Sequence, residues 1–176
     1  FAITVAGLLT NNTQLAVGIY NVKVTATDNN NNQATSTGVI TVSDTTLPVF
    51  TTGILAAQTR EFATQAVSQQ LAATDAAAIT YAVNDTDFAI NGAGLLTNNT
   101  QLAVGIYNIK VTATDASNNA ATSIGVITVS DTTIPIFTTG VTTQPKEFAT
   151  QGISPNIVAT DVAGILSYAV NDTNFA

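Results

Sequence analysis

The chain contains 176 residues, 45% of them hydrophobic, and it has no cysteine, histidine, methionine or tryptophan. Without cysteine and histidine there are no disulfide bonds, and the commonest transition-metal ligands and the commonest general base at neutral pH are missing. The net charge is −7 with only four basic residues, which argues against binding to nucleic acid or to an anionic membrane surface. No apolar run approaches the roughly 20 residues of a membrane-spanning helix, so we expect no membrane insertion within this segment.

An internal repeat dominates the sequence. Residues 1–50 recur without gaps at 88–137, so the period is 87 residues, and only nine of the 50 positions differ. The nine positions are Thr4, Val5, Val22, Asn29, Asn30, Gln33, Thr37, Leu47 and Val49. The rest repeats more loosely, since EFATQ at Glu61 recurs at Glu147 and YAVNDT at Tyr81 recurs at Tyr168. This period is too long for a solenoid repeat and matches a small sandwich domain, so we expect independent modules joined end to end.

Strand signals follow one another along each period. Residues 107–114 alternate strictly between apolar and polar side chains, and Asn-rich turns at Asn29 and Ala116 separate pairs of long β-branched segments. No segment has a convincing helical pattern. We expect strands near 49–53, 66–74, 79–84, 86–91, 94–98, 105–114 and 121–130.

Proline marks the expected module boundaries. Pro48 and Pro135 lie in DTTLPVF and DTTIPIF, and proline suits a linker or the first residue of an edge strand because it cannot donate to a sheet. Residues 48–134 are therefore expected to form one complete module. On the same phasing, residues 1–47 are the last strands of one module, and residues 135–176 are the first strands of another.

The order of these elements resembles the cadherin-like repeat. The matching pieces are ATD ending at Asp75, then ITYAV, DFAINGAGLLT, GIYNIKVTATD and the closing VITVSDTTIPIF. The segment ATDASNNAATSIGVITVSDTTIP is also similar to the ending of bacterial Ig-like (hyalin-type) repeats. The resemblance covers the whole chain. It implies an all-β fold of tandem seven-strand Greek-key β-sandwich modules, linked end to end, with a role in extracellular adhesion.

The resemblance further implies calcium at the junctions between modules, where clustered acids supply the 6–8 oxygen ligands that Ca²⁺ takes. Carried over residue by residue, the family's motifs keep only part of their acids, because the acidic pair before the tyrosine strand reads QLAVG and the double-aspartate motif reads ATDAA. The alternative is that the remaining acids cap turns. The expected ligands are Asp44, Asp75 and Asp115 at the first junction, and Glu61, Asp131 and Asp161 at the second.

Catalysis has no support in the sequence, so we expect no enzyme. Serine and threonine have no histidine to activate them. The pair Asp85 and Asp87 is not kept in the second copy, where Asn174 replaces the second carboxylate, and a turn is the better interpretation. Sequons at Asn11, Asn84, Asn98 and Asn171 are candidate glycan acceptors in a secreted protein.

These observations favour a structural subunit or repeat segment of an extracellular filament, sheath or giant cell-surface adhesin. The expected partners are copies of the chain itself, joined head to tail or laterally, because only 9% of residues are charged and such surfaces associate. The two incomplete modules are complementary, so we expect either that the sequence is cut from a longer chain or that separate copies complete each other by strand addition. The alternative is a recognition module of an adhesin that binds a glycan or a protein.

Overall fold

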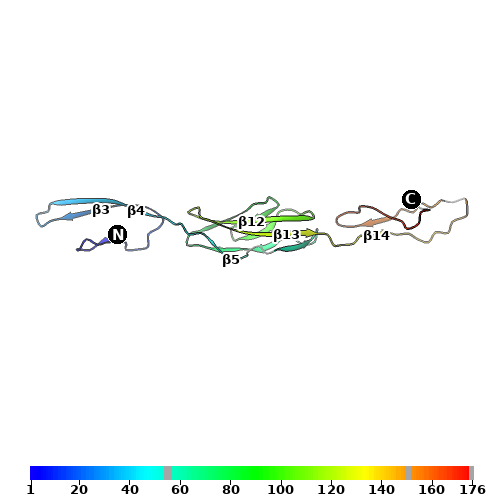
Figure 1. The fold of residues 1–176 in the computed structure, drawn as a ribbon, viewed down its shortest axis with the longest axis horizontal. Coiled ribbons are helices and arrows are strands. Elements are labelled where there is room, and N and C mark those ends of the chain that lie inside the picture. Colours follow the sequence, from blue (N-terminus) through cyan, green and yellow to red (C-terminus); the bar gives the residue numbers. More distant parts are fainter. Residues whose placement is uncertain (54–56, 150–151, 175–176) are drawn as a thin grey trace.

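The computed structural model describes residues 1–53, 57–149 and 152–174, and these residues form strands and turns without a helix. The all-β architecture expected from the sequence is thereby confirmed. Figure 1 shows three units in a row, with the amino-terminal and carboxyl-terminal units on opposite sides of a central one. No helix long and apolar enough to span a membrane is found among the described residues.

The amino-terminal unit consists of two antiparallel strand pairs. The short strands β1 (Ala2–Ile3) and β2 (Leu9–Thr10) pair with each other, and the long strands β3 (Gly18–Thr27) and β4 (Gln33–Val42) form a hairpin. Asn31 adopts a left-handed conformation (φ 63°) in the turn of that hairpin, as asparagine tolerates better than most residues. The hairpin predicted from the Asn-rich run is therefore present.

The described residues of the central unit form the strands from β5 to β13. A four-stranded sheet has the order β6-β13-β12-β9, a three-stranded sheet the order β10-β11-β7, and β5 pairs with β8. The strands are β5 (Val49–Thr52), β6 (Gln58–Glu61), β7 (Ser68–Gln70), β8 (Ala72–Thr74), β9 (Ile79–Val83), β10 (Phe88–Ile90), β11 (Leu95–Asn98), β12 (Gly105–Asp115) and β13 (Ala120–Ser130).

The core of the molecule lies within this central unit. Alternate residues of the long strands β12 and β13 point inward, and the other sheets cover them, as expected of a two-layered sandwich. Apart from Ala159, every buried apolar residue among those described belongs to the central unit. The core cluster contains Val67, Leu71, Phe88, Leu96, Leu102, Ile109, Val111, Ile127 and Val129.

Two details of the strand prediction differ from the structure. The predicted strand 66–74 divides at Leu71 into β7 and β8, which belong to different sheets, because the N–H of Leu71 donates to the carbonyl of Gly94 (2.9 Å). Gly94 has φ +83°, and a Cβ there would lie 2.2 Å from the Leu71 carbonyl oxygen, so the close approach requires glycine. Strand β6 was not predicted, because its sequence QTRE has no apolar alternation and its parallel pairing with β13 is non-local.

In the described part of the carboxyl-terminal unit, β14 (Ile136–Thr139) and β15 (Val158–Thr160) pair antiparallel. They correspond by the repeat to β5 and β8, and the register is the same in both pairs, including one irregularity at the same position. The local sequence therefore forms the same pair twice, although only the first pair is covered by a second layer.

Candidate metal centre

Asp115 ends β12 and organises the turn that follows. Its Oδ1 accepts hydrogen bonds from the N–H groups of Ser117 and Asn119 (both 2.8 Å), and its Oδ2 accepts one from the side-chain amide of Asn119 (2.8 Å). The residue is buried. Burial raises the pKa of Asp115, but the bonds from Asn119 and Ser117 outweigh it, so the pKa lies below its ordinary value. Asp115 is therefore ionised at neutral pH.

Two further carboxylates meet Asp115 at the same end of the central unit. Asp44 comes from the segment after β4, and Asp75 follows β8. One carboxylate oxygen from each of the three residues lies within 4.8 Å of the other two. The structure thus brings together the three acids that the cadherin-like resemblance assigned to the first junction.

Local hydrogen bonds fix the two partners of Asp115. Asp44 Oδ1 accepts from the N–H (3.0 Å) and hydroxyl (2.5 Å) of Thr46, and Asp75 Oδ1 accepts from the N–H of Ala77 (2.9 Å). Both residues are half-buried. These are turn-capping bonds, so the capping role considered from the sequence is also present.

The donor set of this cluster suits a hard cation. Three carboxylates so close together repel one another, and a cation between them would relieve that repulsion. All the side-chain atoms that could bind a metal here are oxygens, which Ca²⁺ prefers, and each carboxylate can bind through one or two of its oxygens. Asp44 comes from the linker and the other two acids from the central unit, so a bound ion would tie the linker to the module.

The acids of the second junction gather more loosely. Glu61 accepts from the N–H (2.9 Å) and hydroxyl (2.8 Å) of Thr132, while Asp131 Oδ1 accepts from the N–H (3.1 Å) and hydroxyl (2.6 Å) of Thr133. The hydroxyl of Thr133 also lies 3.5 Å from Asp161 Oδ2. The bond from the Thr133 side chain holds the pKa of Asp131 below its ordinary value. Among the described residues, only the first group meets the mutual distance of 4.8 Å.

Sequence reasoning missed the residues that hold these acids in place. The side-chain amide of Asn119 donates both to Asp115 and to the backbone carbonyl of Asp44 (3.1 Å), which joins the turn to the linker. Thr132 and Thr133 anchor Glu61 and Asp131. The repeated sequences DTT and NN were the available signal, since short polar side chains beside an aspartate often bond to it.

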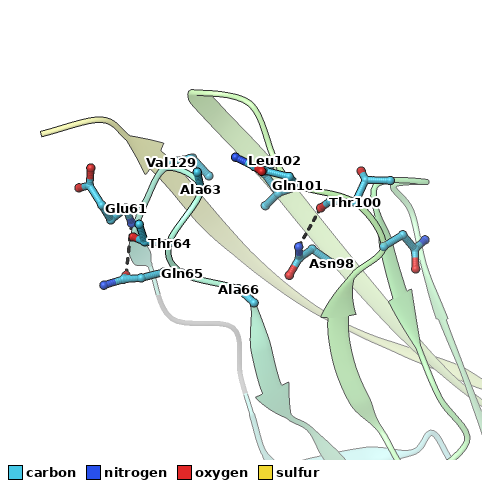
Figure 2. Close-up of a pocket in the computed structure, with 11 residues that line it drawn as sticks. Glu61, Ala63, Thr64, Gln65, Ala66, Asn98, Thr100, Gln101, Leu102 and Val129 are labelled. Carbon is cyan, nitrogen blue, oxygen red and sulfur yellow. Dashed lines mark hydrogen bonds between the residues drawn. The ribbon is translucent and has the colours of Figure 1, made fainter. Parts of the chain in front are cut away.

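A separate hollow of about 380 Å³ lies at the other end of the central unit. Its lining is rich in amide side chains, including Gln65, Asn98 and Gln101, with Leu102 and Val129 as apolar contacts. Figure 2 shows the Glu61 carboxylate directed away from Asn98 and Gln101. This position agrees with the bonds of that carboxylate to Thr132. The hollow is therefore lined by polar groups, but the carboxylate of Glu61 does not point into it.

Comparison with known proteins gives matches among solved structures only. No family model and no curated protein matches the sequence. The chain is similar to Drosophila N-cadherin EC1-4, with 22% identity over 64% of this chain and 32% of that one and a TM-score of 0.44. It is similar to extracellular cadherin domains 1–4 of protocadherin gamma B7, with 21% identity over 72% and 36% and a TM-score of 0.45.

Mouse cadherin-23 EC22-24 is a further match, with 22% identity over 68% of this chain and 45% of that one and a TM-score of 0.44. The chain spans between about a third and a half of the length of these proteins. All three are extracellular cadherin segments, and this is the family that the order of motifs in the sequence resembles.

Proposed function

We propose that the chain is a structural or adhesive segment of an extracellular surface protein, in which sandwich modules joined end to end form a filament, sheath or giant adhesin. The observation that carries this proposal is the repeat of strand geometry along one line of units (Figure 1). Equivalent aromatic pairs in the central and carboxyl-terminal units illustrate this repetition. The ring centroids of Phe50 and Tyr81 lie 6.5 Å apart with an interplanar angle of 49°, and those of Phe137 and Tyr168 lie 6.4 Å apart with an angle of 49°. A structure of this kind sets length by copy number and resists extension through its interstrand hydrogen bonds.

Residues 48–134 serve in this proposal as the complete module, with 1–47 and 135–176 as parts of its neighbours. The core cluster, which runs from Val67 to Val129, lies within the complete module. Pro48 is buried, which suits a fixed start of the module rather than a loose spacer. The end of the linker, at Pro48, is therefore packed as part of the complete module.

Calcium is the cofactor in this proposal, held by Asp44, Asp75 and Asp115. An ion that binds a linker acid and two module acids restricts the angle between modules, so the array becomes straighter and stiffer. Because the ion binds the folded state, it also stabilises the module, by about 2.7 kcal/mol at a free concentration of 100 times Kd.

The test is thermal unfolding of the chain with calcium and with chelator. We expect Asp75→Asn to abolish the calcium-dependent rise in Tm. Asp85→Asn is the matched control, because Asp85 caps its turn in the same way, accepting from the N–H two residues on (2.9 Å), but lies outside the cluster. A wild-type Tm that is insensitive to calcium refutes the metal site and leaves the structural role standing.

A second candidate function is recognition of a glycan or a protein by the amide-lined hollow (Figure 2). Amide side chains are suitable partners for sugar hydroxyl groups, since each both donates and accepts. Binding of the chain to a glycan array, lost in Gln101→Ala and kept in Gln14→Ala, would favour this function. Gln14 is the control because it occupies the same position of the repeat in the amino-terminal unit.

A further inference from the structure

The turn between β10 and β11 contains the only Asn-Gly pair of the sequence, at Asn91 and Gly92. The carbonyl carbon of an asparagine side chain is open to attack by the backbone nitrogen of the residue that follows it. Most side chains at the following position shield that nitrogen, whereas glycine has no Cβ to do so. The turn lies within the central unit, and its hydrogen bonds are all made inside that unit.

The side chain of Asn91 is held by two backbone donors. Its Oδ1 accepts hydrogen bonds from the N–H groups of Ala93 and Leu95 (both 3.0 Å). When a nucleophile adds to the side-chain carbonyl, negative charge develops on this oxygen. Two donors already directed at the oxygen stabilise that charge, as the donors of an oxyanion hole do in an enzyme. The turn therefore activates the carbonyl group that caps it.

The nitrogen of Gly92 is accessible for this reaction. Asn91 and Gly92 are both exposed, and a Cβ built on Gly92 would meet nothing within 4 Å. Among the residues that the structure describes, no acceptor for the N–H of Gly92 is found. Water therefore reaches this N–H group and can take its proton, which makes the nitrogen nucleophilic.

We propose that Asn91 is a site of spontaneous modification, at which the folded chain converts asparagine to aspartate and isoaspartate. The nitrogen of Gly92 forms a bond to Cγ of Asn91, and the bond from Cγ to the amide nitrogen breaks. The proton of the Gly92 N–H passes through water to the leaving nitrogen, which departs as ammonia and leaves a cyclic imide.

Water then opens the imide at one of its two carbonyl carbons. Cleavage of the new bond to Cγ gives aspartate, and cleavage of the original peptide bond gives isoaspartate. The only co-reactant is water, and neither an oxidant nor an enzyme is needed. The proposal does not rest on the proposed structural function.

The aspartate product fits the turn. Two other turns of the chain are capped by aspartate in the same way, since Asp28 and Asp115 each accept from the N–H groups two and four residues on, at 2.8 to 2.9 Å. Asn91 accepts from the groups at the same two positions. A carboxylate therefore replaces the amide without a change of the turn, and it adds one negative charge.

The isoaspartate product does not fit. Its main chain runs through Cγ, so the turn gains one backbone carbon and the capping carbonyl becomes part of the main chain. The turn is closely packed, because the carbonyl of Gly94 accepts from the N–H of Leu71 (2.9 Å) and the carbonyl of Ala93 accepts from the side-chain amide of Gln70 (2.6 Å). A longer turn displaces both carbonyls, so we expect isoaspartate to weaken this contact.

The first copy of the repeat supplies a control for the chemistry. Thr4 and Val5 stand there at the positions of Asn91 and Gly92. The N–H of Leu8 donates to the hydroxyl oxygen of Thr4 (3.1 Å), as the corresponding N–H donates to Asn91 (3.0 Å). The turn thus forms with threonine and valine, so the double variant Asn91→Thr/Gly92→Val is expected to fold and cannot react.

The test is incubation of the folded 176-residue chain in mildly alkaline buffer, followed by proteolysis and mass spectrometry that separates the asparagine, aspartate and isoaspartate peptides. We expect Asn91 to convert at least about tenfold faster than any other asparagine, a difference of about 1.4 kcal/mol in activation free energy. Gly92→Val keeps the asparagine but shields the nucleophile, so it should slow the conversion to the rate of the other asparagines.

A parallel incubation in urea distinguishes the folded turn from the bare sequence. Conversion of Asn91 in the folded chain supports the proposal. An Asn91 that is lost in urea but stays intact in the folded chain would overturn it, and so would a rate that Gly92→Val leaves unchanged.

Thermal unfolding of the incubated chain tests the consequence for the turn. Asn91→Asp should have the Tm of the wild type, whereas the fraction that contains isoaspartate should unfold at a lower temperature. The double variant Asn91→Thr/Gly92→Val should keep its Tm throughout the incubation. An isoaspartate fraction as stable as the unreacted chain would contradict the close packing of the turn against Leu71.

Discussion

Leu96 provides the most direct test of where the stability of this chain resides. It is fully buried in the core cluster together with Leu71 and Phe88. Truncation by Leu96→Ala removes buried methyl groups and leaves a cavity, and fully buried leucines lose about 3 kcal/mol in this way. For a module of this size that loss lowers Tm by roughly 12–24 °C. The same change in the amino-terminal unit, Leu9→Ala, should cost less than about 1 kcal/mol, because Leu9 is 37% exposed.

The assay is urea unfolding followed by circular dichroism. The two variants change the same residue in the same local sequence, so the difference between them measures burial alone. Equal losses at the two positions, or a loss below about 1 kcal/mol at Leu96, would show that the two-layered core is not what stabilises the central unit.

Two further predictions use the same assay. Gly94→Ala should destabilise the chain by clearly more than Gly7→Ala, although both glycines have φ +83°, because a Cβ at Gly94 would lie 2.2 Å from the Leu71 carbonyl oxygen and a Cβ at Gly7 has nothing within 4 Å. Gly7→Ala therefore costs only the left-handed strain of about 1–2 kcal/mol. Equal losses of stability would contradict the close approach at Gly94. The pKa of Asp115 in the folded chain lies below its ordinary value of 3.8, so its contribution to stability is present above that value and is lost as the pH falls through the folded pKa. Asp115→Asn should therefore make the free energy of unfolding depend less on pH below about pH 4. An unchanged pH dependence would refute the lowered pKa of Asp115.

The long hairpins were predictable because their signals are local. Strict alternation in 107–114 and the Asn-rich turns indicated β12 and β13 to within a residue or two. Strand β6 escaped notice because QTRE has no apolar alternation and exists as a strand only through its parallel pairing with β13. Such a strand depends on a partner about 70 residues away, and no window of sequence contains that information.

The candidate site, too, was predictable only in part. The sequence supplied the acids and the resemblance grouped them by junction. It did not supply Asn119, whose side chain joins Asp115 to the backbone of Asp44 across 75 residues. A bond of this kind follows from how the linker passes over the turn, which is a property of the folded module.

The sequence by itself determined the period, the turns and the alternation of the strands, because backbone conformation and side-chain spacing are set by neighbouring residues. Only the tertiary structure decided which of the repeated residues are buried. Leu9 and Leu96 have the same neighbours in sequence, yet only Leu96 lies under a second layer of strands. Burial, and with it the hydrophobic free energy, depends on what covers a face, and in the central unit that covering comes from residues distant in the chain.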